Sequence, residues 1–349
     1  MFVYRHNHLW YIAYNLNNMH RTIIHIPLFL ICCICLNMVS VRAQLSTNPI
    51  VHDPVLIKQD SVYHLFCTGM GIAHFSSTDM KHWKHEPPVF PQTPGWTVVK
   101  VKGFKGHFWA PDISFYKGKY YLFYAVSEFG KNTSCIGLAE NKTLNTSSPD
   151  YKWIDKGMIV QSVPGRDMWN AIDPNLIVDE DGTPWLDFGS FWEGIKLVRL
   201  KADLSAIDEQ QQWLTLASRE RKFGTADSLA GDAAIEAPFI FKHGDYYYLF
   251  VSFDYCSRGI NSTYKVMVGR SKKIMGPYLD KKEVPMTKGG GSLVAEGNKD
   301  WYGVGHNAVY HFDGKDIIIY HGYSAADNGK PHLIVHDLLW DQNGWPVVQ

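Results

Sequence analysis

The chain has 349 residues, with 34 Lys and Arg against 34 Asp and Glu, so its formal net charge is zero. This balance offers no broad electrostatic field to nucleic acid or to an anionic membrane, and we expect neither as a partner. Three cysteines lie beyond the N-terminal leader, at Cys67, Cys135 and Cys256. Their odd number and wide spacing exclude a disulfide framework and a cysteine metal site.

Residues 1–43 are predicted to be an N-terminal extension followed by a signal peptide. A plausible start at Met19 precedes a basic pair, a largely apolar run that ends at Val41, and a small residue, Ala43. The alternative is a membrane anchor, but the run is barely long enough to span a bilayer and Pro27 interrupts it. We therefore expect a secreted or periplasmic protein, without stable membrane insertion after signal removal, whose folded domain covers residues 44–349.

The folded region repeats one pattern five times: a polar head, an apolar run, a turn and an aromatic strand. Glu236-Ala237-Pro238 shows it best, because an apolar run and a glycine turn lead from it to Tyr246-Tyr247-Tyr248. The five heads lie at positions 53, 112, 173, 236 and 306. A repeat of roughly sixty residues with strand-type content suits one four-stranded propeller blade. The sequence predicts an all-β, five-bladed β-propeller in a single domain, with five equivalent heads around one axis.

Three of the heads are the acids Asp53, Asp173 and Glu236, which a propeller would bring together from distant parts of the chain. Asp112 follows its proline instead of preceding it, so we expect this acid to point differently and to have a structural or supporting role. The fifth head, His306, could ligate a metal or be a satisfied core histidine, and position alone does not decide between them.

Three converging carboxylates beside aromatic residues predict glycoside hydrolysis. Glu236 has apolar neighbours and the longer reach, so we assign it as the general acid. Asp53 would be the base that activates water, and Asp173 would stay ionised and orient both. Attack by water with inversion requires the base and acid carboxyls to lie roughly 6.5–9.5 Å apart.

Several motifs together resemble glycoside hydrolase family 43, and within it the endo-1,5-α-L-arabinanases. They cover the chain from about residue 46 to its end. They are His52-Asp53-Pro54, Trp109-Ala110-Pro111-Asp112, Asn170-Ala171-Ile172-Asp173-Pro174, Gly189-Ser190-Phe191-Trp192, Glu236-Ala237-Pro238, Asp254-Tyr255-Cys256-Ser257-Arg258-Gly259, Gly289-Gly290-Gly291-Ser292 and Gly305-His306-Asn307.

The resemblance implies a five-bladed propeller that inverts configuration. It implies Asp53 as general base, Glu236 as general acid and Asp173 as the acid that modulates pKa values and orients. His306 would help to hold a calcium ion, largely through waters. The substrate-contacting positions that it implies are Trp109, Asn170, Ala171, Ile172, Asp173, Ser190, Phe191 and Trp192.

We expect a monomer that cleaves arabinan, a neutral polysaccharide, internally at α-1,5 linkages. The first alternative is an exo-acting α-L-arabinofuranosidase or β-xylosidase of the same family. The second is a non-catalytic sugar-binding propeller, which would have no need of three converging carboxylates.

Overall fold

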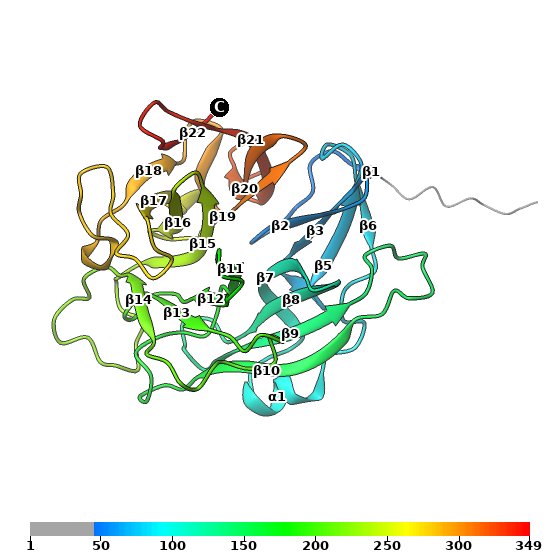
Figure 1. Ribbon diagram of the computed structural model, residues 1–349, viewed down its shortest axis with the longest axis horizontal. Helices are drawn as coiled ribbons and strands as arrows, with labels where there is room; N and C mark the ends of the chain where they lie inside the picture. Colours follow the sequence, from blue (N-terminus) through cyan, green and yellow to red (C-terminus); the bar gives the residue numbers. More distant parts are fainter. Residues whose placement is uncertain (1–44) are drawn as a thin grey trace, which may run out of the picture. The chain divides into compact units, whose positions relative to one another are not determined.

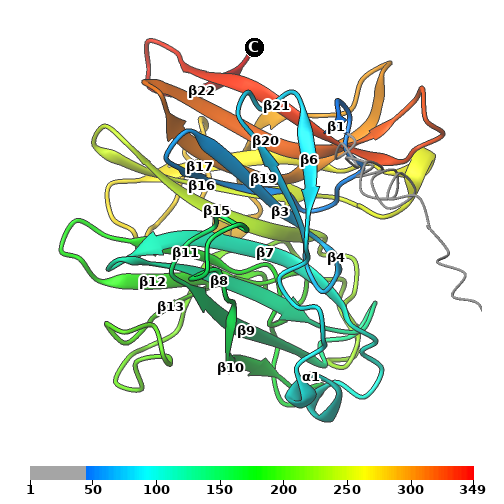
Figure 2. The ribbon, with the colours of Figure 1, turned by 90° about the vertical axis from the view of Figure 1, so that its right-hand side faces the viewer.

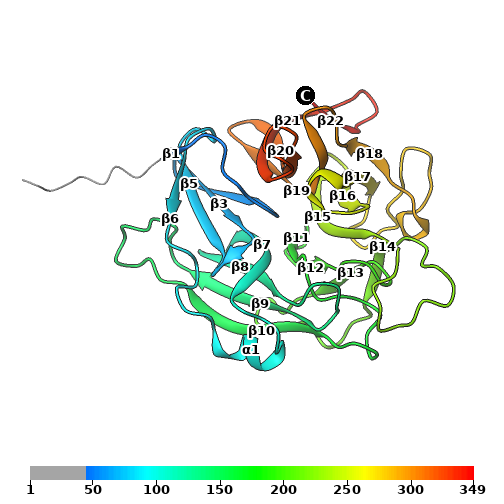
Figure 3. The same ribbon diagram turned by 180° about the vertical axis from the view of Figure 1, so that it is seen from behind.

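Five antiparallel β-sheets follow one another along the chain and surround a common axis (Figure 1). The computed structural model describes residues 45–349, and the predicted signal peptide lies outside them. Each sheet is one blade, and its first long strand lies nearest the axis (Figures 1 and 3). These strands are β2, β7, β11, β15 and β19. The five-bladed β-propeller predicted from the repeat is confirmed.

The strands of each blade run consecutively from the axis outward, apart from two short strands at the start of the chain. Blade 1 contains β1 (Leu45–Ser46), β2 (Val55–Gln59), β3 (Val62–Cys67), β5 (Ala73–Ser77) and β6 (Trp83–Glu86). Blade 2 contains β4 (Gly69–Met70), β7 (His107–Tyr116), β8 (Lys119–Val126), β9 (Ser134–Asn141) and β10 (Ile154–Ser162). Blade 3 contains β11 (Asn175–Val178), β12 (Pro184–Phe188), β13 (Ile195–Arg199) and β14 (Leu214–Ala217). Blade 4 contains β15 (Ile235–His243), β16 (Tyr246–Phe253), β17 (Lys265–Ser271) and β18 (Ser292–Ala295). Blade 5 contains β19 (Trp301–Phe312), β20 (Lys315–Ser324), β21 (Pro331–Trp340) and β22 (Pro346–Val348).

Helical structure is confined to short connecting segments: α1 (Gly95–Lys100), η1 (Gly259–Asn261) and η2 (Met286–Lys288). α1 lies beside β10 (Figures 1 and 2), where the Trp96 indole N–H donates a 2.9 Å hydrogen bond to Asp155. Among residues 45–349, no helix combines the length and the apolar character that crossing a bilayer requires.

The second strand of each blade is buried on both faces, which explains why its sequence is apolar without alternation. β12 is buried along its whole length, and β8 and β16 are buried from their second residue on. Tight turns join the first and second strands. In blade 5, Asp313 and Gly314 both have positive φ, at 52° and 77°, as a type I′ hairpin turn requires.

A residue in the left-handed conformation stands at the inner entrance of every blade. The five residues are Asp53, Ala110, Asp173, Ala237 and His306, with φ between 43° and 56°. In blades 2, 4 and 5 this residue lies within a break of the strand register. Proline follows it in four blades, where the missing N–H costs no ladder hydrogen bond. The backbone therefore turns in the same way at all five entrances.

Side chains of a neighbouring blade accept hydrogen bonds from four of these five backbone amides. The pairs are Asp53 N–H to His321 Nδ1 (3.1 Å), Ala110 N–H to Thr68 Oγ1 (2.8 Å), Ala237 N–H to Asp173 Oδ2 (3.0 Å) and His306 N–H to Ser252 Oγ (2.8 Å). Buried backbone donors need such partners, since an unpaired N–H away from water is costly. The blades are thus joined at the entrances where the polar heads lie.

The structure corrects the alignment of two heads. The residues equivalent to Asp53 are Ala110 and Ala237 in blades 2 and 4, whereas the sequence prediction aligned Asp112 and Glu236. Asp112 lies two residues farther along β7 and is buried. Its carboxylate accepts hydrogen bonds from the Leu176 amide (2.8 Å) and from Asn175 Nδ2 (3.3 Å) of blade 3. The expected structural role of Asp112 is therefore confirmed.

The ring closes between the N-terminal segment and blade 5. The Val51 amide donates to the Pro331 carbonyl at 3.2 Å, and the Leu333 amide donates to the Pro49 carbonyl at 3.3 Å. β1 lies along the outer edge of blade 1, paired with β6 (Figure 2). Closure therefore takes place only a few residues before Asp53.

We expect Asp112→Ala to destabilise the propeller by about 1–3 kcal/mol, because the Leu176 amide would remain buried without an acceptor. Urea unfolding followed by tryptophan fluorescence measures the change. Asp150→Ala is the matched control, since Asp150 is exposed. A loss for Asp112→Ala no larger than that of the control would contradict the assignment of this carboxylate as a clamp between blades.

Candidate active site

The predicted acids come together at the axial end of the inner strands, and all three are buried, with side chains from blades 1, 3 and 4. Asp53 and Asp173 occupy the left-handed positions of blades 1 and 3. Glu236 directly precedes the left-handed residue of blade 4, at the start of β15. The three charges act on one another, because both Glu236 and Asp53 raise the pKa of Asp173.

Asp53 is held by both oxygens. Oδ1 lies 2.8 Å from His52 Nδ1 and 3.0 Å from His306 Nδ1. Oδ2 accepts a 2.5 Å hydrogen bond from Thr68 Oγ1, which itself accepts the Ala110 amide at 2.8 Å. An ionised carboxylate can only accept hydrogen bonds, so the Thr68 hydroxyl donates its single hydrogen to Asp53. The carboxylate therefore has little rotational freedom.

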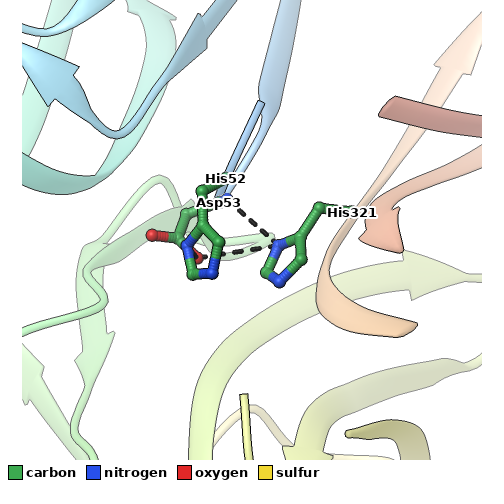
Figure 4. Close-up of side chains that lie close together, drawn as sticks. All are labelled: His52, Asp53 and His321. Atoms are coloured by element: carbon green, nitrogen blue, oxygen red, sulfur yellow. Dashed lines mark hydrogen bonds and ion pairs between the residues drawn. The ribbon is translucent and has the colours of Figure 1, made fainter. Parts of the chain in front are cut away.

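His321 lies beside Asp53 and is neutral. Its Nδ1 accepts the Asp53 amide, its Nε2 lies 3.3 Å from Tyr323 Oη, and its ring stacks on that of His52 at 3.9 Å (Figure 4). Burial lowers the pKa of His321 well below its usual range, and His52 adds to this effect. His52, Asp53 and His321 each offer a metal-ligating atom within 4.8 Å of the others. Because the Asp53 amide already occupies the His321 Nδ1 lone pair, the group is a hydrogen-bond network.

The two histidine contacts keep Asp53 ionised. Burial by itself would raise the pKa of Asp53, but the charges and hydrogen bonds of His306 and His52 outweigh it and hold the pKa well below its usual range. For His306, burial acts to lower the pKa, and the attraction of Asp53 overcomes it, so that the pKa rises to about 9. Asp53 and His306 thus form a buried pair of opposite charges.

Asp173 has the opposite behaviour. Burial is the main cause that raises its pKa to about 8. Repulsion from Glu236 and Asp53 acts in the same direction, against the lowering by His306 and by the Ala237 amide. Because this carboxyl lies away from water and beside two other acids, its pKa is displaced upward, the opposite direction from that expected for an acid that stays ionised. Its Oδ2 accepts the Ala237 amide at 3.0 Å, one residue from Glu236.

Three side chains hold the carboxyl group of Glu236. Ser190 Oγ donates to Oε2 at 2.8 Å, and Tyr264 Oη donates to Oε1 at 2.8 Å. Cys256 Sγ also contacts Oε1, at 3.2 Å. Ser190 was predicted to contact substrate, and the structure places its hydroxyl on Glu236.

The predicted aromatic platforms differ in exposure. Trp109 is half-buried and lines a hollow of about 280 Å³ together with His107, Glu128 and Phe129, whose ring is 83% exposed. Phe191 is also half-buried. Trp192 is only 2% exposed, and its indole N–H donates to the Asp227 carbonyl, so the prediction that its ring contacts a ligand is wrong. Its indole is instead hydrogen-bonded to the loop that contains Asp227.

The segment Asn170, Ala171 and Ile172 leads to Asp173 and is buried. The Ala171 amide donates to Ser162 Oγ at 3.0 Å, so this residue anchors the segment to blade 2. Asn170 Oδ1 has no partner among residues 45–349 although it is buried.

Four residues that contact the acids were not predicted from the sequence: Thr68, Cys256, Tyr264 and His321. Cys256 and Tyr264 belong to the segment that resembles arabinanases, and this was the available signal. Thr68 lies between β3 and β4 and His321 lies in β20, both outside the motifs, and His321 reaches Asp53 only because blade 5 closes against blade 1.

A five-bladed propeller that gathers three buried carboxyl groups at one end of its axis, two of them with pKa values displaced in opposite directions, has the architecture and chemistry of a glycoside hydrolase. The chain belongs to glycosyl hydrolases family 43, whose family model matches residues 46–346.

Two relatives carry names that refer to α-(1→5)-linked L-arabinose. The chain is 52% identical over 298 residues to the extracellular exo-α-(1→5)-L-arabinofuranosidase ArbA of Cellvibrio japonicus, covering 85% of this chain and 86% of the relative. It is 41% identical over 305 residues to the extracellular endo-α-(1→5)-L-arabinanase 1 of Bacillus subtilis, covering 86% and 88%. Among solved structures, the α-L-arabinanase of Cellvibrio cellulosa in complex with arabinohexaose has a TM-score of 0.85 and 51% identity, covering 86% of this chain and 96% of that one.

Proposed function

We propose that this protein hydrolyses α-1,5-linked L-arabinan with inversion at the anomeric carbon. The observation that carries the proposal is the cluster of Asp53, Asp173 and Glu236 at the axial end of three different blades. Relatives at 52% and 41% identity are named for the α-(1→5)-L-arabinose linkage, and a similar structure was solved with arabinohexaose. The zero net charge agrees with a neutral polysaccharide as substrate.

Asp53 acts as the general base. Its low pKa keeps it ionised, and His52, His306 and Thr68 aim its oxygens. It accepts a proton from a water molecule as that water attacks the anomeric carbon. Glu236 gives its proton to the glycosidic oxygen as the bond to the anomeric carbon breaks, so the released sugar leaves as a neutral alcohol.

Asp173 orients the acid and modulates the charge of the site. It does so through the Ala237 amide, which it holds next to Glu236, and by carrying a proton that limits the negative charge at the axis. Three ionised carboxylates in one buried site would repel one another strongly.

The calcium ion implied by the family resemblance fits His306. With Nδ1–H donating to Asp53, the other ring nitrogen of His306 could face a cation after giving up its proton, the arrangement of a carboxylate–histidine–metal triad. Asn307, the next residue, has a buried side chain without partners among the described residues, as neighbours of a hydrated ion would. When bound, the ion adds positive charge beside the carboxylates. Metal analysis of the purified protein, with melting curves before and after chelation, tests this site.

Internal cleavage is the mode expected from the sequence motifs. A specific observation favours the exo mode as the second candidate: the relatives named for exo action are 50–52% identical, whereas the bacterial ones named for endo action are 25–42% identical. Both modes use the same three acids and differ in where the chain end of the substrate lies.

We expect export from the predicted signal peptide, and two of the relatives are named extracellular. The three described cysteines are free thiols, so the fold is stabilised without disulfides between them. N-terminal sequencing of protein recovered outside the cytoplasm would locate the cleavage site, and light scattering would test the expected monomer.

Glu236→Ala should lower kcat on linear arabinan by at least about 10²–10⁴-fold, because no other group replaces the acid, while leaving binding of arabino-oligosaccharides measurable. Reducing-sugar release and calorimetry measure the two properties. Asp245→Ala, an exposed acid of the same blade, should behave as wild type. Near-normal turnover by the Glu236 variant would rule out its assignment as the acid.

His52→Ala should move the acidic limb of the kcat/KM profile to higher pH. His52 lowers the pKa of Asp53, so without it the base takes up its proton at a higher pH and activity is lost earlier on acidification. The alkaline limb should move less. The matched control is His85→Ala, since His85 is exposed in the same blade. An unchanged acidic limb would contradict Asp53 as the group that sets it.

A product time course on debranched arabinan separates the two modes. Endo action should produce mixed oligosaccharides and a rapid loss of viscosity at low conversion, because each cut shortens a long chain. Exo action should produce one small product from the start, with viscosity nearly constant. Following the anomeric configuration of the first product by NMR tests inversion in the same reaction, and a retained configuration would overturn the proposed mechanism.

A further inference from the structure

The two oxygens of the Glu236 carboxyl group have unequal surroundings. Oε1 receives both Tyr264 Oη, at 2.8 Å, and Cys256 Sγ, at 3.2 Å. Oε2 has one protein contact among the described residues, the hydroxyl of Ser190 at 2.8 Å. An acid that must give up one proton thus has one crowded and one open oxygen.

Both groups at Oε1 are held in their protonated forms. Burial raises the pKa of the Tyr264 phenol well above its usual range, and the charge of Glu236 adds to it. The Cys256 thiol behaves in the same way and for the same two reasons. A phenol and a thiol can each donate one hydrogen bond, so Oε1 receives two hydrogens. Its two lone-pair directions are then used.

Tyr264 is built rigidly into this position. Its ring is 1% exposed and lies against β19 at Gly305, where an added Cβ would approach Tyr264 Cδ1 to 2.2 Å. An added Cβ at Gly303 would lie 2.9 Å from the Tyr264 amide nitrogen. These two glycines of the Gly303-Val304-Gly305 segment therefore make room for the tyrosine that contacts the acid. The ring also stacks on His321 at 5.8 Å.

We propose that Tyr264 and Cys256 are positioning residues that occupy Oε1 and so place the transferable proton of Glu236 on Oε2. The inference rests on the proposed role of Glu236 as general acid. The Ser190 hydroxyl accepts from the protonated Oε2 while the site waits for substrate, and it turns to donate once the proton has left.

The Oε2–H bond breaks as the proton moves to the glycosidic oxygen, and the bond from that oxygen to the anomeric carbon breaks with its electron pair kept by the departing sugar. The carboxylate that remains is stabilised by the two donors on Oε1 and by Ser190 on Oε2. The proton of the attacking water goes to Asp53.

The test compares two substrates. Arabinotriose has a poor leaving group that must be protonated, whereas the 2-chloro-4-nitrophenyl glycoside of arabinotriose releases a phenolate that needs no proton. For Tyr264→Phe we expect kcat on the oligosaccharide to fall about 10–100-fold, and on the aryl glycoside less than about 3-fold. Cys256→Ala should show the same pattern with a smaller loss, and Cys256→Ser should restore activity because a hydroxyl can also donate to Oε1.

Tyr278→Phe is the matched control, because this buried hydroxyl donates to the Ile274 carbonyl in the outer part of blade 4. It should affect both substrates equally. Equal losses on both substrates for Tyr264→Phe and Cys256→Ala, or no loss on either, would overturn the inference.

The Glu236→Gln variant tests the acid assignment separately from the positioning roles of Tyr264 and Cys256. If Glu236→Gln loses activity on the oligosaccharide and keeps it on the aryl glycoside, the acid assignment stands and the two positioning residues are judged separately. If Glu236→Gln loses both equally, the assignment of Glu236 as the acid fails, and the inference fails with it.

Discussion

The site depends on one backbone constraint, repeated in each blade: a non-glycine residue held in the left-handed conformation at the inner entrance. Such a conformation costs on the order of 1–3 kcal/mol and persists only where the surroundings enforce it. The register break, the following proline and the hydrogen bonds between blades supply that enforcement. Alanine fills the position in blades 2 and 4, so the polar side chains of Asp53, Asp173 and His306 are not its cause. The left-handed conformation is therefore a property of the propeller fold, and it places the side chains of Asp53, Asp173 and His306 at the axis.

Unequal neighbours then give equivalent positions different proton affinities. Asp53 and Asp173 share a backbone conformation and are both buried, yet one touches two imidazoles and the other accepts a backbone amide near two acids. Their pKa values move in opposite directions for this reason. Because their pKa values are displaced in opposite directions, one buried site can hold an ionised carboxylate next to a protonated carboxyl group.

Much of this could be predicted from the sequence. The repeat gave five blades, because each hairpin carries its own pattern, and the three acids were found because two directly precede a proline and one lies two residues before it. The predicted alignment of the blades was wrong in blades 2 and 4, because the acids Asp112 and Glu236 were aligned with Asp53 in place of the residues that precede proline. The burial of Trp192 could not be foreseen, since it depends on a distant carbonyl at Asp227. Likewise His321 and Tyr264 reach the acids only after the blades have closed into a ring.

That closure has a consequence for the order in which the enzyme becomes competent. Asp53 is among the first residues of the domain to leave the ribosome, but His306 and His321, which orient it, are among the last. The N-terminal segment that leads to it also pairs with Pro331 and Leu333. A nascent chain that has completed four blades already contains all three acids, yet Asp53 has neither its charge partner nor its final direction. Catalytic competence therefore arrives with the C-terminal blade and not before.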